Sequence, residues 1–224
     1  MCVLMSPYNN RVMRRILLLL LAALNLGAQP RRTAPGQFDF YVLSLSWSPD
    51  YCAGPAGARD RFQCAGPRKY GFVVHGLWPQ FERGWPEECT TDRLNLPASL
   101  RRDILEIMPS ERLMNHEWRK HGTCSGLTPK QYFEGILTTW ANVRIPPELK
   151  NLTAAELEFS PADLERKFVA ANSGLKPNML AVDCSGRFLK EVQVCFDKNL
   201  KFRTCSAQVE RGCPLSKITV RPIR

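Results

Sequence analysis

Eight cysteines follow a short apolar N-terminal segment, and this combination constrains the fold more than any other feature of the sequence. Cys2 precedes the apolar segment, and the other eight cysteines are Cys52, Cys64, Cys89, Cys124, Cys184, Cys195, Cys205 and Cys213. An even number of cysteines in an exported chain indicates disulfide bonds. A structural zinc site is the alternative, but no C-x-x-C pair occurs and the spacings do not suit zinc ligands. We therefore expect a disulfide-stabilised fold, whose pairing the residues alone leave open.

Residues 1–28 have the pattern of a secretory signal peptide. Three arginines precede an apolar run over 16–26, and small residues follow it up to position 28. The run is shorter than the roughly 20 residues that cross a bilayer, and its flanks are those of a signal peptide. A buried N-terminal helix is the alternative, which the absence of acidic residues before Asp39 disfavours. We expect export to the periplasm or secretion, and a mature form without a membrane segment.

The rest of the chain has the length of one domain. Residues 29–36, Q-P-R-R-T-A-P-G, predict a short flexible lead-in, and 37–224 predict a single domain. The formal charge of +10 falls by the three leader arginines to about +7 in the mature chain. An excess of positive charge favours a polyanionic partner.

Hydrophobic periodicity predicts strands, then helices, then strands. The alternation over 38–47 predicts a strand with Tyr41, Leu43, Leu45 and Trp47 on one face, and 70–78 predict a second strand that ends near Gly76. Helices are expected over 97–108, 112–124, from Pro129 after the cap Thr128, and from 161 to Gly174. Further strands are expected at 179–184, 188–196 and 201–205. This order predicts an α+β domain with a largely antiparallel sheet packed against several helices.

The three histidines lie in two short segments of the chain. His75 belongs to F-V-V-H-G-L-W-P-Q, and His116 and His121 belong to H-E-W-R-K-H-G-T-C. If the second segment is helical, His116 lies beside Lys120 and Glu117 lies beside His121, because residues i and i+4 share a face. Two histidines can supply a general base and a general acid near neutral pH, and a lysine can stabilise a negatively charged transition state.

Three other interpretations of this cluster fit the sequence less well. A zinc protease of the H-E-x-x-H type needs histidines at i and i+4, whereas these are at i and i+5. A nucleophilic triad with Thr123 or Ser125 lacks a G-x-S-x-G turn. In the third interpretation the histidines are ordinary polar residues of a helix, but this does not explain why all three lie in two short segments. The cluster and the positive charge together favour cleavage of a phosphodiester without a metal or other cofactor.

Both histidine segments resemble the active-site segments of the ribonuclease T2 family, in the order found there. D-F-Y-V-L-S-L-S-W-S-P-D-Y-C at 39–52 and F-L-K-E-V-Q-V-C-F-D at 188–197 are also similar to members of the family, particularly exported bacterial ones. The resemblance covers 38–214. It implies an α+β fold and an endoribonuclease that cleaves single-stranded RNA with little base preference, through a 2′,3′-cyclic phosphate that is hydrolysed to a 3′-phosphate.

The resemblance also implies roles for individual residues. His75 and His121 would be the acid–base pair, with His121 favoured as the base. Glu117 and Lys120 would stabilise the transition state, and His116 would hold the phosphate.

Further roles are expected around this pair. Trp78 would stack on a base, unless it belongs to the core. Gln80 stands where members of the family often have an Asp or Asn that binds a base, so the base preference is left open. The implied disulfides are Cys52–Cys64, Cys89–Cys124, Cys184–Cys213 and Cys195–Cys205. Asn151 in N-L-T is a glycosylation acceptor only in a eukaryotic host.

Two alternatives to an active ribonuclease belong to different functional classes. One is a relative of the fold that binds RNA or a protein partner without cleaving it, which the presence of every implied catalytic residue disfavours. The other is a secreted disulfide-rich binding module that shares these segments by chance. We expect RNA as the partner, a monomer, and no cofactor.

Overall fold

A computed structural model describes residues 33–224. The predicted signal peptide and residues 29–32 of the lead-in lie outside the described residues. Gly36, at the end of the lead-in, donates its backbone N–H to the carbonyl of Cys124 over 2.9 Å. Residues 33–36 are therefore attached to the segment that follows the two clustered histidines.

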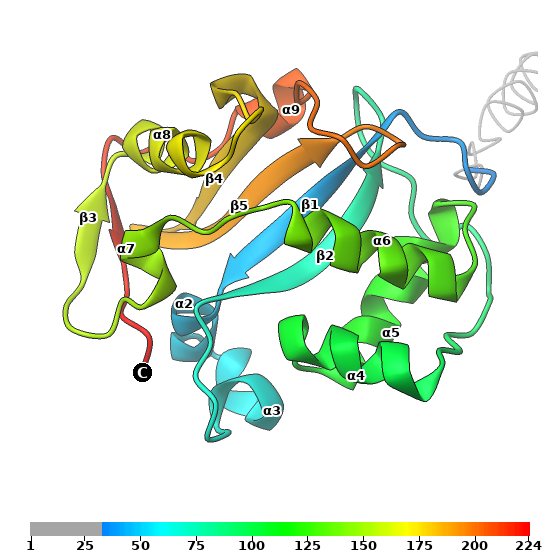
Figure 1. The fold of residues 1–224 in the computed structure, drawn as a ribbon, viewed down its shortest axis with the longest axis horizontal. Coiled ribbons are helices and arrows are strands. Elements are labelled where there is room, and N and C mark those ends of the chain that lie inside the picture. Colours follow the sequence, from blue (N-terminus) through cyan, green and yellow to red (C-terminus); the bar gives the residue numbers. More distant parts are fainter. Residues whose placement is uncertain (1–32) are drawn as a thin grey trace, which may run out of the picture. The chain divides into compact units, whose positions relative to one another are not determined.

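One six-stranded sheet forms the centre of the fold (Figure 1). Its strands are β1 (Phe40–Trp47), β2 (Phe72–Gln80), β3 (Leu157–Phe159), β4 (Leu180–Ser185), β5 (Phe188–Phe196) and β6 (Ile218–Val220). The order is β2-β1-β5-β6-β3, and β4 pairs with β5. All pairings are antiparallel except one parallel contact between β5 and β6.

Helices pack around this sheet. They are α2 (Ser48–Ala53), α3 (Arg61–Cys64), α4 (Ala98–Ile107), α5 (Glu111–Lys120), α6 (Pro129–Ala141), α7 (Pro147–Lys150), α8 (Pro161–Ala171) and α9 (Ala207–Glu210), with 3-10 turns at Gly57–Arg59, Gly122–Cys124 and Pro177–Met179. In Figure 1, α4, α5 and α6 form a group beside β2, and α8 lies beside β4. Thr128 caps α6 in a capping box, as its sequence predicts.

The predicted α+β class with a largely antiparallel sheet is confirmed. Several details differ from the prediction, among them the short helices α2, α3, α7 and α9, which were not predicted. Strand β2 continues to Gln80 and does not end near Gly76, and α5 ends at Lys120 and does not continue to 124. Residues 201–205 form one isolated bridge between Phe202 and Phe196. The three-residue strands β3 and β6 were not predicted, since such short segments have too few residues to show a period.

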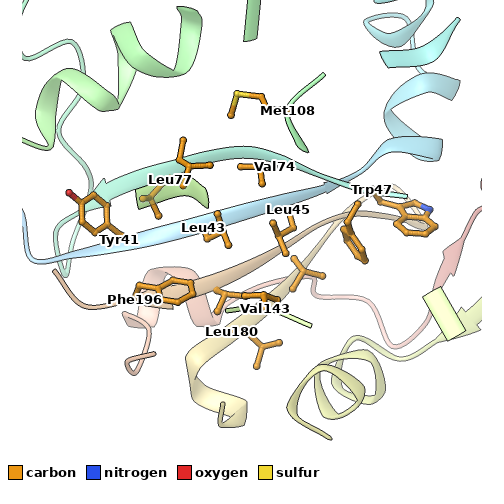
Figure 2. Close-up of a cluster of buried hydrophobic side chains, with 14 of the residues drawn as sticks. Tyr41, Leu43, Leu45, Trp47, Val74, Leu77, Met108, Val143, Leu180 and Phe196 are labelled. Carbon is orange, nitrogen blue, oxygen red and sulfur yellow. The ribbon is translucent and has the colours of Figure 1, made fainter. Parts of the chain in front are cut away.

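The two faces of the sheet have different environments. Tyr41, Leu43, Leu45 and Trp47 of β1 join the main core, as their alternation predicts, and Figure 2 shows them with Val74 and Leu77 of β2. Phe40 and Val42 point to the other face, where a small second cluster forms with Ala181, Cys195, Cys205 and Val209. This second face also carries buried polar residues, including Ser44 and Glu191. The main core therefore supports a polar face on the opposite side of the same strands.

Four disulfide bonds hold the chain. They join Cys52 to Cys64, Cys89 to Cys124, Cys184 to Cys213 and Cys195 to Cys205. These are the four pairs that the family resemblance implies.

Candidate active site

A β-bulge in β2 determines where His75 points. Ser44 and Leu45 of β1 pair with Gly76 and Val74, so His75 is an extra residue in β2. In a regular strand, residues three apart lie on opposite faces. The bulge shifts the alternation by one residue, so that His75 and Trp78 both face the cleft. Leu77 can then join the main core.

One cleft of about 470 Å³ collects the seven residues predicted for the site. Strand β2 contributes His75, Trp78 and Gln80. Helix α5 with its C-cap contributes His116, Glu117, Lys120 and His121. Much of the remaining lining comes from four residues that the sequence did not predict for the site: Trp85, Gln193, Gln208 and Arg211. Trp85 is half exposed, which is unusual for a side chain of its size and was not foreseeable from its irregular segment.

The end of α5 positions the second and third histidines. Ser110 caps the helix by accepting a hydrogen bond from the N–H of Leu113, and His121 closes it by donating its N–H to the carbonyl of Glu117. The 3-10 turn over Gly122–Cys124 follows at once and is joined to the preceding loop through Cys89. His121 is therefore held between a helix end and a disulfide-bonded turn.

Glu117 connects the two histidine segments. Its carboxylate is 1% exposed, and Oε1 lies 3.6 Å from Nε2 of His75. Oε2 accepts a hydrogen bond of 2.7 Å from Nε1 of Trp78. Burial raises the pKa of Glu117, although His75, Trp78 and Lys120 act in the opposite direction.

The pKa values of His75 and His121 are shifted in opposite directions. Burial lowers the pKa of His121 to about 3, and the positive charge of Lys120 adds to the decrease. Burial also lowers the pKa of His75, but the carboxylates of Glu191 and Glu117 outweigh it, so the pKa is raised. The charged form of His75 and the neutral form of His121 thus coexist in the cleft over a broad pH range. Two titratable groups with separated pKa values are suited to be an acid and a base.

His116 and Lys120 lie on the more open side of the cleft. His116 is exposed, and partial desolvation of its ring, together with the neighbouring Lys120 and Arg119, lowers its pKa. The Nζ atom of Lys120 lies 3.8 Å from Oε2 of Glu87, and both side chains are partly exposed. An ion pair this exposed contributes little stability, so Lys120 remains available to an anion in the cleft.

Trp78 and Gln80 lie beside the histidines. The Trp78 ring is only partly buried, and its centroid lies 5.2 Å from that of His75 and 5.3 Å from that of His121. It is thus both a wall of the cleft and a neighbour of the small second cluster. Gln80 is buried, and its amide donates to the carbonyl of Pro79.

The described part of the chain has neither a metal-binding cluster nor a membrane-spanning helix. Between residues 33 and 224, no three His, Cys, Asp or Glu side chains lie close enough together to bind a metal ion. Over the same residues, none of the helices has the length and apolar character to span a bilayer.

Comparison with protein families identifies the fold that carries this cleft. The model of the Ribonuclease T2 family matches residues 38–205. The chain belongs to the ribonuclease T2 family. That match includes β1, β2, α5 and β5, which together carry the two histidine segments and the polar face of the sheet.

Individual relatives agree with this membership. A ribonuclease of Aeromonas hydrophila is 36% identical over 84% of this chain and 88% of its own length. Ribonuclease I of Escherichia coli is 30% identical over 71% of this chain and 75% of its own length. The crystal structure of RNase NT in complex with 5′-AMP has a TM-score of 0.60 and 25% identity, over 84% of this chain and all of that one. The predictions of this family and of an endoribonuclease of the T2 type are confirmed.

Proposed function

We propose that this ribonuclease T2 family member cleaves single-stranded RNA by transfer of the phosphoryl group to the neighbouring ribose 2′-OH. One observation carries the proposal: His75 and His121 line a single cleft with pKa values shifted in opposite directions. His121, neutral above about pH 3, removes the proton of the 2′-OH. Nδ1 of His121 is buried without a partner among the described residues, so Nε2 is the atom that accepts this proton.

The 2′-oxygen then forms a bond to phosphorus, and the bond from phosphorus to the 5′-oxygen of the next nucleotide breaks. Protonated His75 donates its Nε2 proton to that leaving oxygen. The products are a 2′,3′-cyclic phosphate and a free 5′-hydroxyl. In the second step, His75 takes a proton from a water molecule whose oxygen forms a bond to phosphorus. The bond from phosphorus to the 2′-oxygen breaks, and His121 gives its proton to that oxygen. The products are a 3′-phosphate and a free 2′-hydroxyl.

Three neighbours support this transfer. Lys120 neutralises the charge that builds on the phosphate oxygens, and Glu117, which contacts His75 and Trp78, stabilises the transition state together with it. His116 holds the phosphate from the open side of the cleft. No metal is required, because two imidazoles and an ammonium group provide the proton transfers and the charge neutralisation.

Trp78 provides a stacking surface for a base, with Gln80 beside it. Stacking is insensitive to the identity of the base, so little base preference is proposed. The similar structure of RNase NT is a complex with 5′-AMP, which supports nucleotides as the class of ligand. We further propose that the mature protein is an exported monomer in the periplasm or outside the cell, freed of residues 1–28.

Incubation of the purified protein with single-stranded RNA in EDTA tests this function. Cleavage is expected in the chelator at the same rate as in buffer with Mg²⁺ or Zn²⁺. Absence of cleavage in all of these buffers, or cleavage that depends on an added metal, would contradict the proposal.

A further inference from the structure

Glu191 is a buried charged residue beneath the cleft, and it has no role in the proton transfers proposed for His75 and His121. It lies in the middle of β5, and its side chain is only 2% exposed. Burial of an unpaired carboxylate is costly, so such a group normally has several partners. The partners of Glu191 lie on β1, on β2 and on β5 itself.

Two hydrogen bonds fix the orientation of this carboxylate. Oε2 accepts from Oγ of the fully buried Ser44 over 3.0 Å, and Oε1 accepts from Nε2 of Gln193 over 2.7 Å. Nζ of Lys190 lies 3.9 Å from Oε1. Burial raises the pKa of Glu191, but His75, Lys190 and Gln193 outweigh it and lower the pKa to about 2. Glu191 is therefore an anion near neutral pH.

The remaining contact of this anion is His75. Oε2 lies 3.5 Å from Nδ1 of His75, an ion-pair distance somewhat too long for a well-formed hydrogen bond. The other ring nitrogen, Nε2, lies on the side of Glu117, 3.6 Å from Oε1. The imidazole is thus held edge-on between two carboxylates, with Nδ1 buried and one-third of the side chain exposed.

We propose that Glu191 is the positioning residue of His75, which holds Nδ1–H of the ring and thereby presents Nε2–H to the leaving oxygen. The proposal rests on the proposed function, in which His75 donates that proton. A carboxylate behind a catalytic imidazole selects the tautomer, fixes the ring plane and stabilises the imidazolium. Because His75 sits on a β-bulge, its backbone is not fixed by a regular pairing, and a side-chain anchor has a clear purpose.

The Glu191→Gln variant tests this role, because it keeps the shape of the side chain and removes the charge. With a short single-stranded RNA, kcat is expected to fall by at least about tenfold, whereas KM is unchanged. The titratable groups around His75 are Glu117 and His116 from α5, His121 at its end, and Glu191 and Lys190 from β5. Tyr51 and Asp60 line a small pocket on another side of His75. Loss of one anion from this set lowers the pKa of His75, so the alkaline limb of the kcat profile moves to lower pH.

Nitrogen NMR of the histidine rings measures the effect of Glu191 on the tautomer and the pKa of His75 without reference to catalysis. In the wild type, His75 is expected to have Nδ1 protonated whenever the ring is neutral. In Glu191→Gln, both tautomers are expected, together with the lower pKa. Glu165→Gln is the matched control, because Glu165 is a half-buried carboxylate on α8 that accepts from the N–H of Val182 and does not line the cleft. It is expected to leave kcat and the His75 titration unchanged.

The outcomes separate this inference from the proposed function. Wild-type values of kcat and of the His75 titration in a folded Glu191→Gln variant overturn the inference alone. A wild-type protein that does not cleave RNA overturns the proposed function, while the NMR titration still tests the coupling. If thermal melting shows that Glu191→Gln does not fold, Glu191→Asp takes its place. This variant keeps the charge but withdraws it from Nδ1, and it is expected to show the same changes at smaller size, with wild-type values again overturning the inference.

Discussion

Nε1 of Trp78 donates a hydrogen bond of 2.7 Å to Oε2 of Glu117, and so connects the strand that carries His75 to the helix that carries the second histidine segment. The two residues are 39 positions apart in the chain. Only the N–H group of the indole takes part in this bond. The faces of the indole rings therefore remain in the cleft, next to the two histidines proposed to transfer protons. A substitution that separates Trp78 from Glu117 should therefore affect both base binding and catalysis.

Gly76→Ala is the smallest change that separates them. A Cβ atom at position 76 would lie 2.1 Å from Oε2 of Glu117 and 2.3 Å from Nε1 of Trp78, which are distances that no side chain tolerates. We expect Glu117 to be displaced, with kcat/KM on RNA at least about tenfold lower, since small misplacements in an active site are costly. Steady-state cleavage of a short RNA measures the effect.

Gly135→Ala provides the control for this substitution. Gly135 lies in α6, and a Cβ there would have only ordinary contacts of 3.7 Å with Leu200 and Leu77. Wild-type activity and an equal or slightly higher melting temperature are expected, because alanine is favoured over glycine within a helix by about 1 kcal/mol. If Gly76→Ala were as active as this control, the fit between Glu117 and Trp78 would not matter for catalysis.

Much of this architecture is predictable from the sequence, since periodicity and caps identify the main elements. The bulge at His75 is not, because it depends on how β2 pairs with β1, and pairing is a long-range property. An alternating strand leads one to group His75 with Leu77, whereas the structure groups His75 with Trp78.

The position of Glu191 beneath the cleft was not predictable from the sequence for the same reason. The alternation of β5 separates Glu191 from Val192 and Val194, which indicates a polar face. The pattern gives no sign that this polar face is buried beneath a cleft, because burial depends on residues of β1, β2 and the distant α5. The site residues within the two histidine segments were predictable, because each segment is a short stretch of sequence that contains several reactive side chains.

The three histidines should not be equivalent. His75→Ala and His121→Ala each remove a proton-transfer group and should lower kcat by about 10²–10⁴. The double variant should cost much less than the two single effects combined, because acid and base serve one reaction. Single-turnover cleavage of a short RNA measures these rates.

His116→Ala is the comparison within the same cleft. His116 is exposed on the open side, so its loss should mainly raise KM, with a smaller decrease of kcat than either of the other two. A His116→Ala variant as slow as His121→Ala, with unchanged affinity for RNA, would place His116 in the chemical step.

The pH profile should reflect the opposite pKa shifts. His121 acts as a base only when neutral, so activity should be lost at low pH, as the pH falls through about 3. His75 acts as an acid only when protonated, and its pKa is raised, so activity should be lost as the pH rises through a value above the ordinary one of about 6.5. The dependence of kcat/KM on pH, which reports the free enzyme, measures both limbs. An acidic limb near pH 6 would contradict the assignment of His121 as the base.

Removal of the disulfide between Cys89 and Cys124 should impair activity more than removal of the one between Cys52 and Cys64. Cys124 ends the turn after His121, and Cys89 follows Glu88, whose N–H donates to the carbonyl of Lys120. The Cys89–Cys124 bond closes a loop of 35 residues, so its double alanine variant should lose about 4 kcal/mol of stability. The Cys52–Cys64 bond closes a loop of 12 residues, and its double alanine variant should lose about 3 kcal/mol. Thermal melting and RNA cleavage of both variants at a temperature where both are folded give the comparison. Equal activities would show that the turn holds His121 without its disulfide.

Product analysis of a short RNA cleaved in EDTA tests the central claim most directly. The substrate is compared with a matched strand in which a 2′-deoxynucleotide stands at the only cleavable position, and the phosphorus NMR spectrum is followed over time. We predict that a 2′,3′-cyclic phosphate appears first and is converted to a 3′-phosphate, and that the deoxy strand binds but stays intact, since it lacks the nucleophile. A 5′-phosphate product, or cleavage of the deoxy strand, would contradict transfer to the 2′-OH by His75 and His121.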